Sequence, residues 1–415
     1  MKVGIYLDNS SPETGGGFTF ENTVLNIISE NLHKTHHSFL IISENLPGKE
    51  YKNLDFIHLD RKKIKFGFID KVKLFVIRFS KKLTGNEDAY KSSIRDLERN
   101  RIKIYLVSQQ VEFLLYFKQN NFLIFDIPYL TTIWDLEHRL QPYFPEVSCN
   151  NAWQKREATL SLLIQRAAYV VTGTETGKKQ IETFYNVPAE KIIVIPIPVP
   201  LIKYNDDIYT YQEILDKYKI QKEFLFYPAQ YWPHKNHVTL LKSLKYLKDE
   251  YQLTMHLVCT GNDKGNKKYI ENYAKKLGLE KQVKILGFVS DRELAVFYKQ
   301  AFALSFLSLF GPDNIPPLEA FSFGCPVLAS RLEGVKEQLG DAAILVDPMS
   351  PGDIATNIHN LYRDTELRNR LVKKGHEHIN SMRSGDFFDK LTECLDRFEL
   401  VRELWSTQDQ YKQEN

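Results

Sequence analysis

Short apolar runs rich in β-branched residues alternate with longer amphipathic segments along nearly the whole chain. This alternation is typical of βαβ units, in which helices join parallel strands, and it argues against a helical bundle or a β-sandwich. In the first half the runs are KVGIYL, SFLIIS, DFIHLD, YLTTIWD, AYVVTG and KIIVIPIP; in the second half they are EFLFYPA, LTMHLVCT, VKILGFV, FALSFLS, CPVLAS and AAILVDP. The sequence therefore predicts an α/β protein with two parallel sheets.

Proline and polar residues interrupt the pattern at PIPVPLIKYNDD, residues 196–207. A chain of 415 residues is also too long for one ordinary hydrophobic core. We therefore predict an N-terminal Rossmann-like domain over 1–198, a linker over 199–207 and a C-terminal Rossmann-like domain over 208–386. A closing helix and a polar tail are expected over 387–415. We expect the two doubly wound domains to face each other across a central cleft.

Composition excludes several classes of protein. A net charge of +3 is too small to indicate a nucleic-acid partner. No apolar run approaches the roughly 20 residues that a membrane span requires. The opening MKVGIYLDNS leads directly into a strand, so we expect a cytoplasmic location. The four cysteines are far apart and lack CxxC spacing, which indicates neither a zinc site nor a disulfide framework.

The segment RKKIKFGFIDKVKLFVIRFSKKL, residues 61–83, interleaves basic and apolar residues and has Asp70 as its only acid. A helix beginning near residue 69 would place Val72, Phe75, Val76 and Phe79 on one side, flanked by basic residues. This pattern fits peripheral contact with the inner face of an anionic membrane. It equally fits a surface helix whose apolar side packs on its own domain.

Ligands of open parallel sheets bind beyond the carboxyl ends of the strands, so the residues directly after each strand are candidates for a site. Gly15, Gly16 and Gly17 follow the first predicted strand and precede an amphipathic helix. Glycines there allow backbone amides to approach a phosphate or a sugar hydroxyl closely. A plain flexible loop is the alternative interpretation.

In the second half, QYWPHKNH follows the strand EFLFYPA and places Gln230 and Lys235 at the mouth of the sheet. Asn236 is a candidate N-cap for the next helix. A lysine there can act as a point charge on a diphosphate, and the alternative is an ordinary solvated lysine. His234 and His237 lack a third ligand at metal spacing, so we assign them to the turn and propose no metal.

The stretch GPDNIPPLEAFSFGCPV follows the strand FALSFLS. The Pro-Pro pair suits the first turn of a helix, and Gly324 with Pro326 ends it. A two-turn helix would then point its positive end into the cleft, with the amides near Asn314 and Ile315 able to meet an anion. Glu319, one turn in, can accept hydrogen bonds from a vicinal diol, or can simply complement the helix dipole.

These residues resemble the retaining glycosyltransferases of family 4, which have the GT-B fold, and the likeness covers nearly all of the chain. It is carried by GPDNIPPLEAFSFGCPVLAS, FLFYPAQYWPHKNH, VKILGFVSDREL, IWDLEHRLQPYFPE and EGVKEQLGDAAILVDP. The resemblance implies that Glu319 binds the ribose hydroxyls, Lys235 the diphosphate and the backbone near Val289 the base. It further implies that Asp313, Asn314 and Ile315 face the donor sugar and phosphates, and that Gly15 to Gly17 close over the donor.

Three positions depart from the family pattern. Gly311 stands where a second glutamate is common, and Gln230 stands where an arginine is often found. Trp134 occupies the usual place of a histidine and is followed by Asp135. If this segment turns helically, Asp135 and His138 lie on one side and could position or deprotonate an acceptor hydroxyl. The alternatives are a capping role for Asp135 and a surface role for His138.

The sequence thus predicts a metal-independent, retaining hexosyltransferase without a cofactor. Its donor would be a nucleoside diphosphate sugar and its acceptor a saccharide or a lipid-linked saccharide. An epimerase or hydrolase of the same fold is one alternative. A catalytically silent sugar-nucleotide-binding subunit is another, and the departures at Gly311 and Gln230 would fit it.

Overall fold

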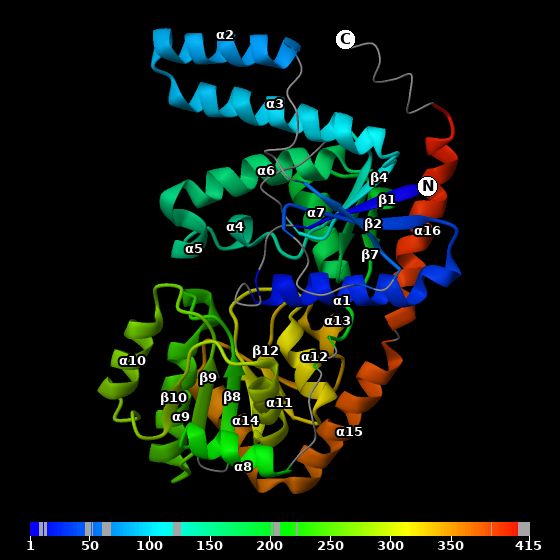
Figure 1. Ribbon diagram of the computed structural model, residues 1–415. Coiled ribbons are helices and arrows are strands. Elements are labelled where there is room, and N and C mark those ends of the chain that lie inside the picture. The colour runs from blue at the N-terminus through cyan, green and yellow to red at the C-terminus, as the bar shows by residue number, and fades with distance from the viewer. Residues whose placement is uncertain are drawn as a thin grey trace.

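The computed structural model describes residues 1–7, 11, 15–45, 51, 53–59, 68–118, 126–200, 202, 208–220, 223–382 and 384–405. The described chain forms two α/β domains, one above the other in Figure 1. Most of the predicted linker and the whole of the polar tail at 406–415 lie outside the described residues. The predicted fold class, two Rossmann-like domains, is confirmed.

The N-terminal domain is built on a seven-stranded parallel sheet in the order β3-β2-β1-β4-β5-β6-β7. Its strands are β1 (Lys2–Tyr6), β2 (Ser38–Ser43), β3 (Asp55–His58), β4 (Phe113–Tyr116), β5 (Tyr129–Thr132), β6 (Tyr169–Thr172) and β7 (Ile192–Val194). All six predicted runs form strands. The seventh strand, β4, was not predicted: every residue of it is buried, so its sequence lacks the alternation that distinguishes a half-exposed strand.

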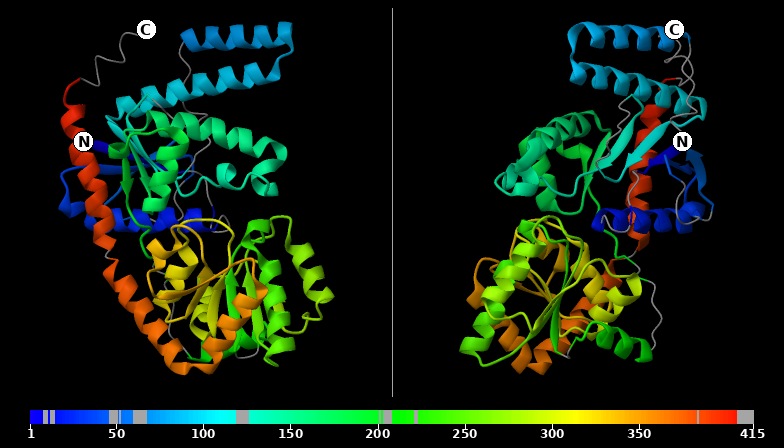
Figure 2. Two further views of the ribbon diagram at one scale, coloured as in Figure 1. Left: turned by 180° about the vertical axis from the view of Figure 1, so that it is seen from behind. Right: turned by 60° about the vertical axis from the view of Figure 1, so that its left-hand side comes forward.

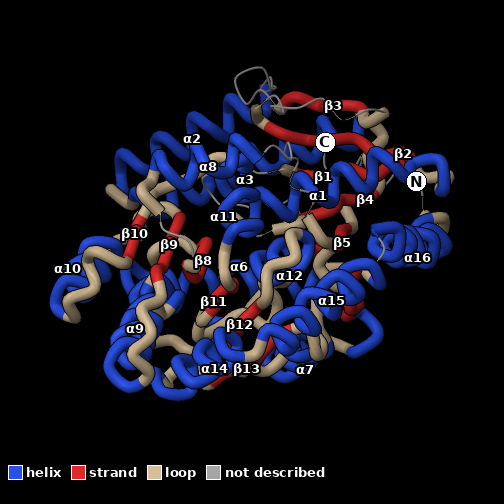
Figure 3. The backbone as a smooth tube through the Cα atoms, turned by 90° about the horizontal axis from the view of Figure 1, so that it is seen from below, coloured by secondary structure: helices blue, strands red, loops and turns tan. Residues whose placement is uncertain are grey.

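The C-terminal domain is built on a six-stranded parallel sheet in the order β10-β9-β8-β11-β12-β13. Its strands are β8 (Phe224–Pro228), β9 (His256–Thr260), β10 (Val283–Ile285), β11 (Ala303–Phe306), β12 (Val327–Ser330) and β13 (Ala343–Val346). Each of the six runs predicted in this half forms one of these strands. Seen from below, α9 and α14 lie on one side of the sheet and α11 and α12 on the other, as in a doubly wound fold (Figure 3).

Helices follow most of the strands. Those of the first half are α1 (Gly16–Asn31), α2 (Phe68–Thr84), α3 (Glu87–Ser108), α4 (Glu137–Leu140), α5 (Pro145–Ser148), α6 (Ala152–Arg166) and α7 (Glu175–Tyr185). Those of the second half are α8 (Ile208–Lys217), α9 (His237–Glu250), α10 (Lys267–Lys276), α11 (Asp291–Gln300), α12 (Ile315–Ser322), α13 (Val335–Leu339), α14 (Pro351–Arg363), α15 (Thr365–Ser381) and α16 (Ser384–Arg402). None of the described helices has the length and apolarity needed to cross a bilayer.

Helix α16 continues from the C-terminal domain and runs up along the N-terminal domain (Figures 1 and 2). Its Phe388 packs against Phe39 of β2, with ring centroids 6.3 Å apart. Its Asp396 lies 2.9 Å from Nε2 of His37, next to the start of the same strand. The last helix is therefore part of the packing of the N-terminal domain, and it joins the two domains a second time.

In each sheet the chain winds outward in two directions from a central pair of strands: β1 and β4 in the first sheet, β8 and β11 in the second. The loops at the carboxyl ends of such a pair are where a doubly wound sheet binds its ligand. Residues from the loops after β1, β8 and β11 line one large cavity between the domains. The topology therefore places the residues that follow these strands at a shared site.

We expect truncation of Phe388 to destabilise the protein, because this ring is fully buried and packs against Phe39 of the N-terminal domain. Phe388→Ala should lower the free energy of unfolding by about 3–5 kcal/mol, as is usual for a buried phenylalanine. Leu400→Ala, on the same helix but with Leu400 71% exposed, is the matched control and should change it by less than about 0.5 kcal/mol. Equilibrium urea unfolding measures both, and equal effects would contradict the packing role of α16.

Candidate functional site

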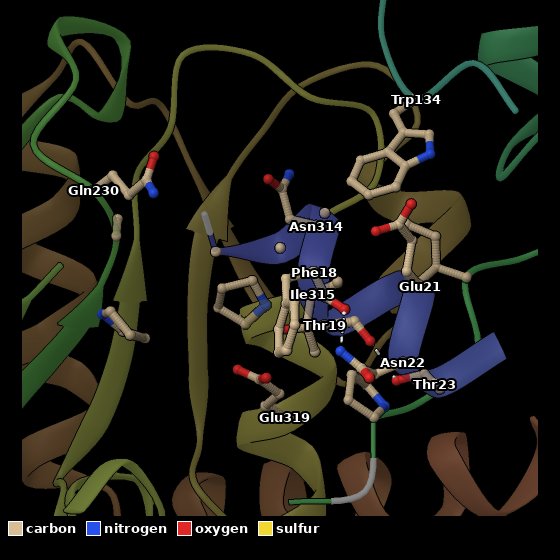
Figure 4. Close-up of a pocket in the computed structure, with 18 of the residues that line it drawn as sticks. Phe18, Thr19, Glu21, Asn22, Thr23, Trp134, Gln230, Asn314, Ile315 and Glu319 are labelled. Carbon is tan, nitrogen blue, oxygen red and sulfur yellow. Dashed lines mark hydrogen bonds between the residues drawn. The ribbon is translucent and has the colours of Figure 1, made fainter. Parts of the chain in front are cut away.

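A cavity of about 1730 Å³ lies between the two domains. Of the residues predicted for the site, those that line it are Gly15, Gly16, Gly17, Asp135, Gln230, Lys235, Val289, Asp313, Asn314, Ile315 and Glu319. Figure 4 shows the start of α1 next to three residues of the C-terminal domain, Gln230, Asn314 and Glu319. Trp134 of the N-terminal domain lies on the other side of this helix in the same view. One predicted residue, His138, does not line the cavity.

The glycine loop lies directly against the C-terminal domain. Gly15 caps α1 with a φ of 84°, a conformation that suits glycine. A Cβ atom on Gly15 would be 3.2 Å from Nε2 of Gln230, and one on Gly16 would be 3.8 Å from the side chain of Ile315. The loop thus approaches two residues of the opposite domain. That these glycines close over a donor stays a prediction.

Lys235 stands at the end of a short 3-10 turn, Pro233–Lys235, that follows β8. Asn236 comes next, with a φ of 56°, and occupies the N-cap position of α9. Its side chain does not cap the helix as predicted: Nδ2 donates instead to the carbonyl of Pro348, at 2.7 Å. This bond ties the turn to the loop after β13 and fixes the direction in which Lys235 projects.

The ammonium of Lys235 lies inside the cavity wall, 3.4 Å from Oγ of Ser308. Burial lowers the pKa of Lys235 to about 8, although Asp135, Glu137 and Glu146 oppose this by favouring the charged form. All three carboxyl groups belong to the N-terminal domain, and burial raises the pKa of Glu137 itself to about 9. A partly desolvated cation at the mouth of a parallel sheet is well suited to an anionic ligand such as a diphosphate.

Glu319 lies in the helix that the sequence predicted. Helix α12 starts at Ile315, has proline in its first turn, and is followed by Gly324 with a φ of 67°. The hydroxyl of buried Tyr298 donates to Oε2 of Glu319 at 2.6 Å. Burial raises the pKa of Glu319 to about 7; the Tyr298 bond opposes this rise and Asp291 adds to it. The carboxyl group is thus fixed and lies at the cavity wall.

The start of α12 differs from expectation in one respect. The backbone amide of Asn314 donates to Oε1 of Gln338 at 2.8 Å, and Nε2 of Gln338 donates back to the carbonyl of Asn314 at 2.9 Å. The expectation that this amide meets an anion is therefore wrong for the described arrangement. This pairing could not be predicted from local pattern, because Gln338 lies 24 residues further along the chain.

Asp313 reaches across to the N-terminal domain. A Cβ atom on Gly173 would be 1.8 Å from Oδ2 of Asp313, so this glycine leaves the space that the carboxyl group fills. The other oxygen, Oδ1, is buried and has no hydrogen-bond partner among the described residues. Burial raises the pKa of Asp313 to about 7, and nearby Asp135 raises it further. Asp313 therefore keeps an unused polar atom at the cavity wall.

Asp135 also lines the cavity and is held by Arg156, whose Nη2 lies 2.6 Å from Oδ1 of Asp135. The amide of Glu137 donates to the same oxygen at 3.0 Å. Burial would raise the pKa of Asp135, but the guanidinium and this amide outweigh burial and hold the pKa below its ordinary value. Asp135 is thus an ionised, oriented carboxylate on the side of the cavity formed by the N-terminal domain.

His138 does not join Asp135 at the cavity, which corrects the expectation that the two act together. The short helix α4 turns His138 into the domain, where it is fully buried. Its Nε2 lies 3.0 Å from Glu157 and 3.4 Å from the hydroxyl of Tyr185. Burial lowers the pKa of His138. The spacing of three residues suggested a shared face, but the helical turn begins only at Glu137, after Asp135.

Sequence reasoning missed a pair of residues that joins the domains at the cavity. Glu146 of α5 accepts a hydrogen bond from the amide of His234 at 3.1 Å and another from its ring nitrogen Nδ1. The ring of His234 stacks on Phe310 at 3.8 Å. Burial lowers the pKa of His234 to about 4, so the ring is neutral near pH 7. His234 therefore bonds the opposite domain rather than serving only its own turn.

Within the described residues, one group of side chains has the close spacing of metal ligands, and it lies away from the cavity. It comprises His36, His37, Asp396 and Glu399, with ligand atoms within 4.8 Å of one another. Asp396 and Glu399 belong to α16, and the two histidines precede β2. The hydrogen bonds of this group link α16 to the N-terminal domain.

Comparison with known proteins places these residues in a family. Residues 211–378 match the model described as glycosyl transferases group 1. O-antigen chain mannosyltransferase RfbU of Salmonella typhimurium is 30% identical over 223 residues, which are 54% of this chain and 58% of that protein. O-antigen chain mannosyltransferase B of Escherichia coli is 23% identical over 232 residues, 56% of this chain and 61% of that protein. The match spans about three fifths of the length of these relatives.

Solved structures extend the likeness to the whole fold. HepE of Anabaena, in a complex with UDP-glucose, aligns with a TM-score of 0.69 at 14% identity, over 96% of this chain and all of HepE. The chain has the GT-B fold, and its residues 211–378 match the group 1 glycosyltransferase model. The group 1 region of the chain contains the whole donor side of the predicted site, from Gln230 to Glu319. Gly15 to Gly17, Asp135 and Glu146 lie outside the matched residues and belong to the N-terminal GT-B domain.

We expect the buried carboxyl group of Glu319 in this GT-B cleft to make the stability of the ligand-free protein depend on pH. Its folded pKa of about 7 exceeds its ordinary value of 4.5, so the folded state keeps a proton that the unfolded chain loses. The contribution of Glu319 to the free energy of unfolding is greatest below about pH 4.5, and it is lost as pH rises through about 7.

The glutamine of Glu319→Gln cannot ionise, so this variant should not lose unfolding free energy over the same pH range. Relative to the wild type, the variant should gain on the order of 3 kcal/mol in unfolding free energy between pH 4 and pH 8. Urea unfolding across this pH range measures the difference. A stability difference between the two proteins that stays constant with pH would show that Glu319 ionises normally in the fold.

Proposed function

We propose that the protein transfers a hexose from a nucleoside diphosphate sugar to a saccharide or lipid-linked saccharide, with retention of configuration and without a metal ion. The observation that carries this proposal is the placement of Lys235 and Glu319 on one cavity within the group 1 region. A cation and a fixed carboxyl group on one wall match the two polar parts of a nucleoside diphosphate.

The donor nucleotide is placed by three residues of the C-terminal domain. Glu319 accepts hydrogen bonds from the ribose hydroxyls, and its bond from Tyr298 orients the carboxyl group for this. Lys235 binds the diphosphate as a point charge. Val289, buried at the cavity wall after β10, marks the backbone against which the base lies.

The transferred sugar lies between the domains in this proposal. The glutamate that the family commonly places at residue 311 is absent, since this position is Gly311. Asp313 and Glu146 each line the cavity and each have a buried oxygen without a partner in the described chain. A carboxylate oxygen can accept hydrogen bonds from sugar hydroxyls, so these two side chains supply the acceptors that Gly311 lacks.

In the chemical step the bond between the anomeric carbon and the phosphate oxygen breaks, and its electron pair leaves with the nucleoside diphosphate. The acceptor oxygen bonds the same carbon from the same face, and its proton passes to the departing phosphate. Lys235 offsets the charge that develops on the leaving group. Gly15 and Gly173 let the two domains approach closely beside the site, which limits competition by water.

The names of two relatives identify them as mannosyltransferases of O-antigen chains. We therefore propose mannose as the first sugar to test and a polysaccharide repeat unit as the first acceptor class. The test incubates the protein with GDP-mannose, UDP-glucose and related donors, with and without a saccharide acceptor, in EDTA. Acceptor-dependent release of nucleoside diphosphate supports transfer. Release without any acceptor would indicate a hydrolase, and binding without release under all conditions a silent subunit.

Lys235→Ala should lower kcat by about 10²- to 10³-fold, because the departing diphosphate loses its charged partner. Lys248→Ala is the matched control, since Lys248 is exposed in the last turn of α9, and its kcat should match the wild type. Steady-state rates of nucleotide release measure both variants, and thermal melting shows whether they fold. A folded Lys235→Ala protein with unchanged kcat would contradict the assignment of the diphosphate.

The pH dependence of donor use should report Lys235 directly. Its pKa of about 8 means that kcat/KM for the donor falls as pH rises above about 8, when the free enzyme loses this charge. Lys235→Arg keeps its charge throughout this range, so its residual activity should lack that fall. Profiles of kcat/KM from pH 6 to 10 test this. The same alkaline fall in both proteins would assign it to another group.

A further inference from the structure

Helices α2 and α3 form a hairpin that stands out from the N-terminal domain. They lie side by side at the end of the molecule farthest from the C-terminal domain (Figures 1 and 2). Lys81 of α2 pairs with Glu87 of α3 at 2.7 Å and lies over the ring of Tyr90. The hairpin is thus held together at its turn, and one face of α2 is directed away from α3.

The outward face of α2 is apolar. Val72, Phe75, Val76 and Phe79 are 48%, 70%, 57% and 55% exposed, and we call these four residues the apolar stripe. Their spacing of three and four residues places them on one side of the helix. The rings of Phe75 and Phe79 stack with centroids 6.4 Å apart. Packing on its own domain, one of the two interpretations that the sequence left open, therefore does not account for this face.

Basic side chains border the apolar stripe on both sides. Exposed Arg78 and Lys82 lie along one edge and exposed Lys73 along the other, by the 100° turn per residue of a helix. The helix has five basic residues, and Asp70 is its only acid. A helix with an apolar face between basic edges is the form that lies flat in a membrane interface, with its cations against anionic headgroups.

We propose that α2 docks the protein on an anionic membrane surface, with the apolar stripe in the headgroup boundary and Lys73, Arg78 and Lys82 against acidic lipids. Charge favours this occupant over a second copy of the chain, because two copies joined at this stripe would bring like charges together. Helix α2 lies at the end of the N-terminal domain away from the C-terminal domain (Figure 1), so docking through it leaves the space between the domains open. The proposal does not depend on which sugar the cleft binds.

The test is sedimentation of the full-length protein with vesicles of phosphatidylcholine, with or without phosphatidylglycerol. We expect binding to the phosphatidylglycerol vesicles that weakens as salt rises, and little binding to neutral ones. Phe75→Ser with Phe79→Ser should weaken binding at least roughly tenfold. Replacing Lys73, Arg78 and Lys82 with Ser should weaken it by about fivefold for each charge removed.

Leu162→Ser is the matched control, because Leu162 is an exposed apolar residue of α6 in the same domain (55% exposed) and should leave binding unchanged. Circular dichroism verifies that each variant folds. Equal binding to neutral and anionic vesicles, or unchanged binding by both α2 variants, would overturn the proposal. So would a dimer in sedimentation equilibrium that the phenylalanine variant dissociates while its vesicle binding stays at the wild-type level.

Discussion

The burial of one cation, the ammonium of Lys235, is the constraint that organises the cleft. Taking an ammonium out of water is costly, and the cost is visible in a pKa lowered to about 8. The carboxyl groups that favour its charged form, on Asp135, Glu137 and Glu146, all come from the other domain. The lysine thus keeps its charge through the closeness of the two domains, and a nucleoside diphosphate would supply a stronger partner at the same place.

The two domains lie this close partly because glycines, which have no side chain, stand at their contact. Gly15 and Gly173 of the N-terminal domain face Gln230 and Asp313 of the C-terminal domain at distances that leave little or no room for a Cβ atom. The bond between Glu146 and His234 joins the same two domains beside Lys235. Because burial keeps His234 neutral, this contact is a hydrogen bond to a carboxylate and adds no second positive charge next to the lysine.

The sequence predicted the parts of the site that follow from local rules. Strand ends, the Pro-Pro start of α12, and the glycine loop each follow from a few neighbouring residues, and Lys235 and Glu319 were located through them. Contacts that depend on tertiary packing were not predictable. The bond between Asn314 and Gln338 and the pair between Glu146 and His234 join segments whose spacing in sequence carries no signal.

His138 is a case in which a local spacing predicted the wrong position for a side chain. Its distance of three residues from Asp135 suggested a common helical face. The chain becomes helical only at Glu137, and Glu157 together with Tyr185 provides a buried polar environment for the ring. Both of these partners contact Nε2 of His138, so they account for its burial away from the cavity, while Nδ1 has no hydrogen-bond partner among the described residues.

Of the three departures from the family pattern, Gly311 and Gln230 lie in loops whose contacts the structure describes. Gly311 has a φ of 101°, and a Cβ atom there would lie 3.1 Å from the side-chain amide of Asn314, so a glutamate at this position would be strained. Asn314 in turn donates to the carbonyl of Gly311, which stabilises the glycine conformation. At the other position, Gln230 accepts a hydrogen bond from Nε1 of Trp232, and its amide nitrogen would lie 3.2 Å from a Cβ atom on Gly15. The backbone around residue 311 therefore favours glycine. Asp313 and Glu146 line the same cavity, and each has a carboxyl oxygen without a partner among the described residues that can replace the acceptors of the missing glutamate.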